Sequence, residues 1–364
     1  MSVTLKKPFK VLLFYAANEE NKTLSYQQGW PHALCSHLGL HCTAINLASS
    51  SLANQLRRKV FIQFLSCDAV IILHSVFSNS CAMALSIQDA LAKIKRRKIF
   101  FIGNEYKLMP EKMTFAQRVG VNLLVTMNPK KKAHELYREC LKCDVVCIPS
   151  AGVNLDIFKS LTPRAERPIS IGYRAYASPL YLGHNERIEI ADRVGSHARS
   201  LGLLTDISTN PEDRFTTSEW VQFLNRCQFQ IGTEAGGRFF DLEDRTRNAV
   251  NQYTAKHPDA DLAELEERFF SKVPDPCTGW MISGRHTEAA ACETVQILFE
   301  GRYNDYFLPD THYISLKKDF SNIDNVFDRM QDQSYCDQVA KNAYQVVEAE
   351  LTYDRLIAKL CKAI

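Results

Sequence analysis

The first 150 residues alternate between short, continuous apolar segments and longer segments in which apolar side chains recur at helical spacing. Continuous apolar segments of this length are typical of parallel strands that are buried on both faces of a sheet. The pattern predicts six strands, at residues 10–15, 42–47, 68–74, 98–103, 122–128 and 144–149. Helices are expected between them, at residues 31–38, 53–65, 82–95 and 130–141. This alternation is typical of a doubly wound α/β domain, which binds its ligand at the carboxyl ends of the strands.

The character of the chain changes after residue 148, at the segment "IPSAGVNLDIFKSLTPRAERP". A glycine turn, an Asn-Leu-Asp step and a connector with proline and arginine are typical of a hinge between domains. The boundary is expected between Lys159 and Pro168. We therefore expect a first domain at residues 1–160 and a second domain at residues 167–335.

The α/β alternation resumes after the hinge. Strands are expected at residues 169–174, 203–208, 227–234, 295–300 and 312–316, and helices at 185–201, 218–226, 288–292 and from 323 onward. Residues 238–276 are charged and only partly helical, so we interpret them as an insertion. The whole pattern predicts the α/β class, with two Rossmann-like, doubly wound domains.

Composition places the chain among ordinary globular proteins. A length of 364 residues, 46% of them apolar and 23% charged, is enough for two separate cores. No apolar run approaches the roughly 20 residues that span a bilayer, and the N-terminal apolar stretch is too short for a signal peptide, so a cytoplasmic protein is expected. The twelve cysteines follow no repeating pattern and are expected to be free thiols. Cys140 and Cys143 have the spacing of a redox pair or half a zinc site, but no second pair accompanies them.

Charge is distributed unevenly between the two halves. Residues 1–160 carry 21 Lys and Arg against 10 Asp and Glu, whereas the remaining residues carry 23 against 31. The basic excess lies in short runs at residues 57–59, 93–98 and 130–132, each near a helix end, where solvated cations are also expected. Together the runs predict a positive potential that attracts an anionic polymer or an anionic membrane face. Nucleic acid is not expected as a partner, because no nucleic-acid-binding motif accompanies the charge.

Three segments resemble known glycosyltransferases. The hinge segment "IPSAGVNLDIFK" is similar to the interdomain link of family 4 type glycosyltransferases, and "EAAACETVQIL" is similar to their donor-site helix and the strand that follows it. The segment "FEGRYNDYFLPDTHYISLKKDFSNID" is closer to the spore-coat-type glycosyltransferase-like branch. The resemblance implies a GT-B type fold, in which two Rossmann-like domains face a cleft. It also implies an acceptor in the first domain, a nucleotide-sugar donor in the second, and a helical tail at residues 336–364 that packs back toward the first domain.

A nucleotide-sugar donor presents ribose hydroxyls and a diphosphate, which require a carboxylate and either cations or helix N-terminal N–H groups. The resemblance places Glu288 at the ribose, and Arg285 with the backbone around Thr287 at the diphosphate. The expected donor-binding residues are Arg174, Arg187, Ser283, Gly284, Arg285, Thr287 and Glu288. In this set, Arg174 and Arg187 correspond to the family's basic pair for the same phosphates. The alternative for Glu288 is an ordinary acid in the first turn of a helix, where the helix dipole favours it.

Two positions depart from the family pattern. The family commonly has a second glutamate eight positions before the ribose glutamate, and here that position is Trp280. Glu234, in "GTEAGG", is the candidate replacement and a candidate catalytic residue; the alternative is a solvated acid in a glycine-rich turn. Glu293 replaces a glycine of the family, so the local backbone is expected to differ.

The segment "LSYQQGWPHAL" in the first domain resembles the family's glycine loop, which leads into a helix beside the acceptor and the donor phosphates. In this interpretation Gly29 allows a ligand to approach closely, Trp30 stacks on a sugar face and His32 begins the helix. The alternative for Trp30 is a place in the hydrophobic core.

Polar residues also end two strands of the first domain. Asn104 and Glu105 follow the fourth strand, where they could orient an acceptor hydroxyl or act as its base. His74 ends the third strand, although a satisfied buried histidine is the more frequent outcome at such a place. No Asp-X-Asp motif stands at a strand end, so neither a metal nor a cofactor is expected, and helix dipoles and cations would stabilise the leaving phosphate.

These observations favour a glycosyltransferase that moves a sugar from a nucleotide-sugar donor to a glycan or lipid-linked acceptor, in bacterial surface polysaccharide synthesis. Peripheral association with the inner face of an anionic membrane is part of this hypothesis. Two alternatives stay open: a sugar-nucleotide epimerase of the same architecture, and a non-catalytic glycan-binding or scaffold protein.

Overall fold

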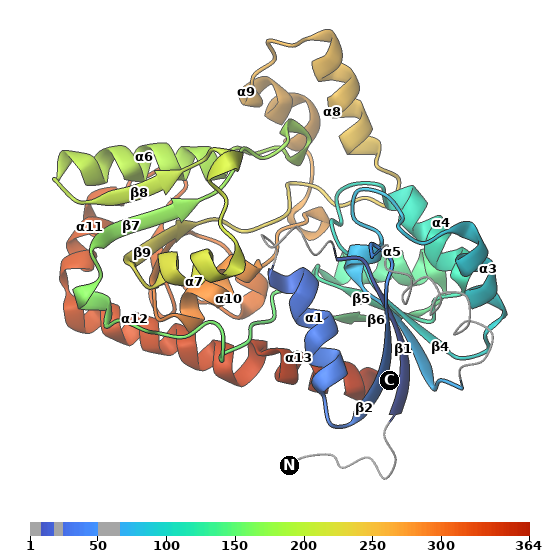
Figure 1. Cartoon of the computed structure of the whole chain (residues 1–364). Helices are drawn as coiled ribbons and strands as arrows, with labels where there is room; N and C mark the ends of the chain where they lie inside the picture. Colours follow the sequence, from blue (N-terminus) through green and yellow to red (C-terminus); the bar gives the residue numbers. More distant parts are fainter. Residues whose placement is uncertain (1–8, 18–24, 50–65) are drawn as a thin grey trace.

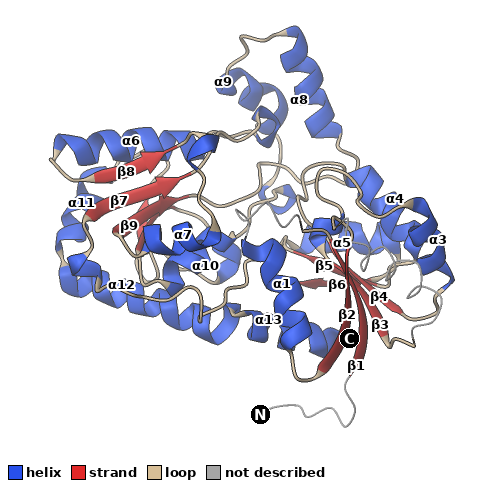
Figure 2. Cartoon of the chain, viewed as in Figure 1, coloured by secondary structure: helices blue, strands red, loops and turns tan. Residues whose placement is uncertain are grey.

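The computed structural model describes residues 9–17, 25–49 and 66–364. Figure 1 shows two α/β domains side by side, with a helical projection above them. Each domain has one parallel sheet, and helices lie on both faces of each sheet (Figure 2). The predicted class, two doubly wound α/β domains, is confirmed.

The first domain contains a six-stranded parallel sheet, as its continuous apolar segments require. The strands are β1 (Phe9–Tyr15), β2 (Leu40–Asn46), β3 (Ala69–Ile72), β4 (Arg97–Phe101), β5 (Leu123–Thr126) and β6 (Asp144–Cys147). Their order across the sheet is β2-β1-β3-β4-β5-β6, and each overlaps a predicted strand. The helices are α1 (Ser25–Ser36), α3 (Leu85–Lys93), α4 (Met109–Val119) and α5 (Lys131–Leu141). The helix expected at residues 53–65 lies outside the described residues.

The second domain contains a five-stranded parallel sheet in the order β11-β10-β9-β7-β8. The strands are β7 (Ile169–Arg174), β8 (Thr205–Ser208), β9 (Cys227–Gly232), β10 (Val295–Phe299) and β11 (Ile314–Leu316). Its helices are α6 (Glu186–Ser200), α7 (Thr217–Leu224), α10 (Gly284–Ala291), α11 (Ile323–Gln331) and α12 (Gln333–Val346). Helix α10 begins four residues before the predicted position, which changes the setting of Glu288.

Residues 238–276 form the projection, with helices α8 (Arg245–Lys256) and α9 (Leu262–Leu265) at the top of Figure 1. A small apolar cluster of its own holds it together, built on Phe239, Val250, Leu265 and Phe270. The segment also reaches the first domain, because Phe240 packs into that domain's core against Tyr137, with ring centroids 5.4 Å apart. The insertion therefore joins the two domains.

Helix α4, which was not among the predicted helices, depends on this insertion for its N-terminus. The carboxylate of Asp244 accepts hydrogen bonds from the backbone N–H groups of Leu108, at 2.7 Å, and Met109, at 3.2 Å. An acidic side chain at a helix N-terminus satisfies donors that have no partner within the helix and favours the helix dipole. The residue that caps α4 thus lies 136 positions away in the sequence.

The C-terminal tail crosses from the second domain to the first. Helix α12 runs along the lower edge of Figure 1 and continues through a π-helical turn, η8 (Val347–Leu351), into α13 (Tyr353–Ala363). Backbone hydrogen bonds join Val153 to the end of this turn, and the guanidinium of Arg97 donates to the carbonyls of Ala363 and Ile364 at 2.7 and 3.0 Å. Helix α13 therefore packs against the first domain.

Tyr353, at the start of α13, explains two glycines of the first domain. Its ring lies edge-on to the ring of Trp30, with centroids 5.5 Å apart. A Cβ at Gly29 would lie 2.1 Å from the Tyr353 hydroxyl, and a Cβ at Gly152 would lie 2.6 Å from its ring. Both positions need glycine because the tail helix comes so close.

Among the residues placed by the structure, no helix combines the length and apolar character that a membrane crossing requires. All twelve cysteines are free thiols in the structure.

Candidate functional site

Three arginines gather where strands of the second sheet end. Arg187 is the second residue of α6, Arg285 is the second residue of α10, and Arg214 follows β8. The guanidinium carbons of Arg187 and Arg214 lie 5.3 and 4.5 Å from the centroid of the Tyr176 ring, which follows β7. Within the described ranges none of the three forms a salt bridge, so their charge is available to an anion. We call Arg187, Arg214 and Arg285 the arginine cluster.

The electrostatic effect of the arginine cluster is visible at Tyr176. Partial burial raises the pKa of its hydroxyl, but the three guanidiniums outweigh burial and hold that pKa below its ordinary value. A diphosphate is the type of anion that such a group of guanidiniums binds, through charge-assisted and bidentate hydrogen bonds. The N-terminus of α10, which carries Arg285, adds the positive end of a helix dipole.

Arg174 does not belong to this cluster, contrary to the prediction. Its guanidinium forms a salt bridge with Asp206 at 2.7 Å and lies over the rings of Phe215 and Phe223, at 4.7 and 4.6 Å from their centroids. Its backbone carbonyl accepts a hydrogen bond from Arg285. Arg214, which the sequence analysis missed, takes its place beside Arg187; its position in a loop after a strand was the only available signal.

Helix α10 carries the rest of the predicted donor segment. Its first turn is Gly284 to Thr287, so Glu288 lies in the second turn, and the alternative of a first-turn acid is wrong. Glu288 is 5% exposed, and its Oε2 accepts a hydrogen bond from the indole N–H of Trp220 at 2.8 Å. A carboxylate can accept further hydrogen bonds beside this one.

Two hydroxyl groups of the same segment form hydrogen-bonding contacts within the first turn of the helix. The Thr287 hydroxyl donates to the Gly284 carbonyl at 2.9 Å, and the Ser283 hydroxyl lies 3.1 Å from Nδ1 of His286. These contacts fix the first turn of α10. Arg285 and the backbone N–H groups are therefore the parts of the turn best suited to a phosphate.

Glu234 follows β9 and is buried, at 8% exposure, so the alternative of a solvated acid is wrong. Its Oε1 accepts a hydrogen bond from the Tyr303 backbone at 2.8 Å. The pKa of the Glu234 carboxyl is raised above its ordinary value, because burial outweighs the backbone N–H groups of Tyr303 and Arg302, which lower it. A Cβ at Gly301 would lie 2.5 Å from Oε2 of Glu234. The carboxylate therefore holds the turn at residues 301–303.

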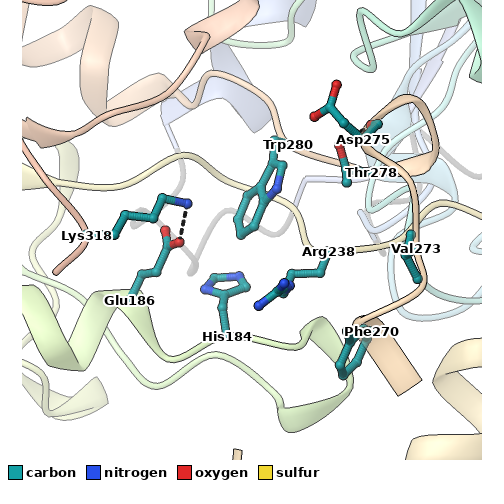
Figure 3. Close-up of a pocket in the computed structure, with 9 residues that line it drawn as sticks. All are labelled: His184, Glu186, Arg238, Phe270, Val273, Asp275, Thr278, Trp280 and Lys318. Carbon is teal, nitrogen blue, oxygen red and sulfur yellow. Dashed lines mark hydrogen bonds and ion pairs between the residues drawn. The ribbon is translucent and has the colours of Figure 1, made fainter. Parts of the chain in front are cut away.

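A cavity of about 330 Å³ is lined by Trp280 and by residues of the insertion (Figure 3). Its walls come from the start of α6, the segment after β11 and the insertion with its C-terminal flank. The lining residues are His184, Glu186, Arg238, Phe270, Val273, Asp275, Thr278, Trp280 and Lys318. Trp280 thus has its ring on a cavity wall. We call this space the insertion cavity.

The first domain meets the second close to the insertion cavity. The Lys130 ammonium forms a salt bridge with Asp275 at 2.7 Å, and the Asn128 side chain donates to the Thr278 carbonyl at 3.3 Å. On the other side, the Asn304 side chain donates to the first-domain Met127 carbonyl at 3.0 Å. Lys130 is therefore an interdomain partner and not a solvated cation of its basic run.

Glu105 is not at the crevice edge, contrary to the prediction. It is 1% exposed, and its carboxylate accepts hydrogen bonds from the hydroxyls of Thr126 and Tyr137, at 2.5 and 2.6 Å, and from the backbone N–H of Met127 at 2.8 Å. The pKa of the Glu105 carboxyl is raised above its ordinary value, because burial outweighs these hydrogen bonds, which lower it. Glu105 fixes the end of β5 to α5 and has no surface for an acceptor.

Asn104 lies in the loop after β4 with a left-handed backbone, φ 48°. Its side chain donates to the Ser78 hydroxyl at 3.2 Å and accepts from the Tyr106 hydroxyl at 3.0 Å. The Tyr106 ring lies 6.4 Å from that of Tyr181 in the second domain. Asn104 thus orders a loop at the domain boundary. His74 is buried, and burial lowers its pKa to about 4.

The predicted glycine loop is part of α1 and its packing. Trp30 is 0% exposed, packs on Phe101 and donates its indole N–H to the Ser150 carbonyl at 3.2 Å, so the core alternative describes it and sugar stacking does not. His32 is exposed in the middle of α1 and does not begin the helix. Gly29 allows the approach of Tyr353, not of a ligand.

No group of His, Cys, Asp and Glu side chains suited to a metal ion occurs in the part of the chain that the structure describes.

Comparison with solved structures identifies the fold. Sucrose-phosphate synthase from Thermosynechococcus elongatus is 10% identical, with a TM-score of 0.56 over 98% of each chain. A DNA-modifying β-glucosyltransferase, studied with and without uridine diphosphoglucose, is 10% identical with a TM-score of 0.56 over 96% of this chain and 98% of that chain. HepE from Anabaena, in complex with UDP and glucose, is 9% identical with a TM-score of 0.52 over 98% and 100%. No protein-family model and no curated protein matches the sequence. The GT-B type fold predicted from the sequence is confirmed.

Proposed function

We propose that this protein is a glycosyltransferase that transfers a sugar from a nucleoside diphosphate sugar to an acceptor hydroxyl. The observation that carries the proposal is the arginine cluster at the strand ends of the second sheet, in which Arg187 and Arg214 lie over the Tyr176 ring and Arg285 also lowers the pKa of Tyr176. In doubly wound domains ligands bind at this edge. The fold shared with HepE, which was solved with UDP and with UDP-glucose, supports the same conclusion.

The donor would lie along the edge of the second domain. Glu288 would accept ribose hydroxyls beside the hydrogen bond that it already accepts from Trp220. The arginine cluster and the N-terminus of α10 would bind the diphosphate and stabilise its negative charge as the bond to the sugar breaks. In this arrangement Glu288 sets the position of the nucleoside, and the guanidiniums serve both binding and leaving-group departure.

The acceptor belongs to the first domain in this proposal, as a glycan or a lipid-linked glycan of a bacterial surface polysaccharide. A membrane-bound acceptor is consistent with the exposed cations Lys93, Lys95 and Arg96 at the end of α3. The same proposal retains the family 4 and spore-coat-type resemblance of the hinge and the donor segment. Cytoplasmic location, with peripheral association at an anionic membrane, is part of it.

One observation favours a second candidate, a protein that binds a nucleotide sugar without transferring it. Two of the predicted catalytic groups, the carboxylates of Glu234 and Glu105, are buried and bonded to internal donors. A transferase that uses an acceptor base would need another group, supplied by the substrate or by the chain.

Calorimetry with a panel of nucleoside diphosphates tests the binding part of the proposal. Arg214→Gln removes one guanidinium that would donate to phosphate. We expect this change to weaken binding of the tightest-binding nucleoside diphosphate by about tenfold or more. Arg199→Gln is the matched control, because Arg199 is exposed in the last turn of α6, at the end of the helix opposite to Arg187. Equal affinity in the two variants would contradict a diphosphate site at the arginine cluster.

Product analysis separates the reactions. Release of nucleoside diphosphate that depends on an added glycan acceptor indicates a transferase, and a new isomer of the intact nucleotide sugar indicates an epimerase. Tight binding with neither product would favour the binding protein.

A further inference from the structure

The insertion cavity is balanced in charge. Each charged side chain on its walls is already paired with an opposite charge. The pairs are Glu186 with Lys318 at 2.6 Å, Asp275 with Lys130 at 2.7 Å, and Arg238 with Glu266. A charged ligand group would therefore find no unpaired opposite charge on these walls. The cavity therefore favours an uncharged ligand, unlike the neighbouring arginine cluster.

One buried acceptor on the cavity wall has no partner. His184 is 6% exposed, and its Nε2 lies 3.1 Å from the Gly236 carbonyl, which can only accept, so Nε2 carries the proton. Burial lowers the pKa of the ring, which is consequently neutral at pH 7. Nδ1 is then a lone-pair acceptor, and it has no hydrogen-bond partner within the described chain. A ligand with a hydroxyl donor would satisfy it.

The remaining walls combine apolar surface with oxygen acceptors. The Trp280 ring lies 4.7 Å from the His184 ring and 4.9 Å from the Lys318 ammonium, and Phe270 and Val273 add apolar contacts. The volume of about 330 Å³ is at the lower limit of pockets for small molecules, roughly 300 Å³. An aromatic wall, one unsatisfied acceptor and a small volume together fit a monosaccharide, which has apolar C–H groups and several hydroxyl donors.

We propose that the insertion cavity binds the sugar of the donor as an uncharged monosaccharide unit, with a sugar hydroxyl donating to Nδ1 of His184. This inference rests on the proposed function. His184 and Glu186 lie next to Arg187 at the start of α6, so a sugar attached to a diphosphate at the arginine cluster would reach the cavity. The insertion supplies Arg238, Phe270 and Asp275 to the cavity wall. The insertion therefore determines which sugar is accepted.

The test compares a nucleoside diphosphate with its sugar ester in wild-type protein and in His184→Phe. The probes are UDP with UDP-glucose and GDP with GDP-mannose, measured by calorimetry. Loss of one neutral hydrogen bond should weaken the sugar ester by about threefold to tenfold and leave the nucleoside diphosphate within about twofold. His197→Phe is the control, since His197 lies in α6, which begins two residues after His184, more than two turns from the cavity, and packs on Phe327. An equal loss for ester and diphosphate would overturn the inference.

Two further measurements start from wild-type protein, and the first of them needs no variant. UDP-glucose should bind more tightly than UDP-glucuronate, because the cavity has no charge left for a carboxylate; the opposite order would overturn the inference. The sugar ester should change tryptophan emission beyond the change caused by the nucleoside diphosphate, and Trp280→Phe should abolish that extra change. An extra change that survives in Trp280→Phe and disappears in Trp220→Phe would place the sugar elsewhere.

Free sugars separate this inference from the proposed function. If no nucleotide probe binds, saturation-transfer NMR with glucose, mannose and N-acetylglucosamine still tests the cavity. Transfer to a free sugar that is lost in His184→Phe would support a monosaccharide site in a protein that is not a glycosyltransferase. No transfer to any of the three sugars would overturn the inference together with the proposed function.

Discussion

Replacement of Glu288 by glutamine is the most direct perturbation of the donor site. The side chain is buried in the second turn of α10, where its Oε2 accepts the indole N–H of Trp220 at 2.8 Å. Glutamine keeps the length of the side chain and one oxygen acceptor for Trp220, but it removes the negative charge. The change therefore isolates the effect of a charged acceptor on a bound ribose.

The expected loss of affinity follows from the strength of hydrogen bonds to charged groups. Each such bond contributes about 1.5 to 3 kcal/mol, and a glutamine amide can replace only part of it. A loss of about 1.4 kcal/mol or more corresponds to at least tenfold weaker binding of the nucleoside diphosphate. Stability should change by about 1 kcal/mol or less, because glutamate and glutamine have similar helix propensities and Glu288 lies beyond the first turn, where dipole effects decline.

The assay pairs a calorimetric titration with a thermal melt on the wild-type protein and Glu288→Gln. Glu293→Gln is the matched control, because Glu293 directly follows the C-cap of the same helix and has a left-handed backbone, φ 52°, which glutamine tolerates as glutamate does. The control should bind nucleoside diphosphate as the wild type does. Wild-type affinity in Glu288→Gln, with an unchanged melt, would refute the assignment of Glu288 to the ribose.

Three further outcomes follow from the structure. Gly29→Ala should destabilise the fold by about 1 to 3 kcal/mol, because its Cβ would meet the Tyr353 hydroxyl at 2.1 Å; urea unfolding of Gly29→Ala, Tyr353→Ala and the double variant should show strong non-additivity. Joint replacement of Lys93, Lys95 and Arg96 by glutamine should weaken sedimentation with anionic vesicles at low salt and leave nucleotide binding unchanged; equal sedimentation would argue against a membrane-facing role. Burial lowers the pKa of His74 to about 4, below its ordinary value of 6.5, so the unfolded chain binds one proton more between these values and the free energy of unfolding falls as pH falls. The slope from this group reaches about 1.4 kcal/mol per pH unit, and a His74→Gln variant unfolded in urea at pH 7 and pH 5 should lack it.

The four basic positions 95–98 illustrate how packing changes an interpretation of charge. The sequence groups them as one solvated run, but the structure separates them into three environments. Lys95 and Arg96 are exposed, Arg97 binds the C-terminal carbonyls, and Lys98 is 5% exposed. A run of like charges in the sequence does not specify which side chains reach the surface, because β4 begins within it.

The missed helix α4 shows a different limit. Its apolar positions Met109, Met113 and Ala116 have helical spacing, so the sequence contained the signal for a helix. The N-terminal cap was not recognisable, because the carboxylate that satisfies Leu108 and Met109 comes from Asp244 in the insertion. Local propensity rules do not include a cap from a distant segment.

The candidate site was predictable in part. Arg187, Arg285 and Glu288 were predicted from the resemblance to glycosyltransferases, and the structure places all three near the strand ends of the second sheet, where this fold class binds ligands. Arg174 also stands at a strand end, yet its guanidinium turns toward Asp206. Arg214 and His184 had no motif around them, and only the folded chain brings them to the arginine cluster and the insertion cavity.

By itself the sequence determined the two α/β domains and their strands, because the burial of continuous apolar segments requires parallel sheets. It did not determine the environment of single polar and aromatic side chains such as Glu105, Trp30 and Glu234. Their burial and hydrogen-bond partners depend on elements that are distant in the sequence, as in the contacts of Trp30 with Ser150 and Tyr353. Strand patterns follow from local periodicity, whereas the accessibility of one carboxylate follows from the packing of all the segments around it. Only the tertiary structure could therefore distinguish the side chains that face a ligand from those that hold the fold together.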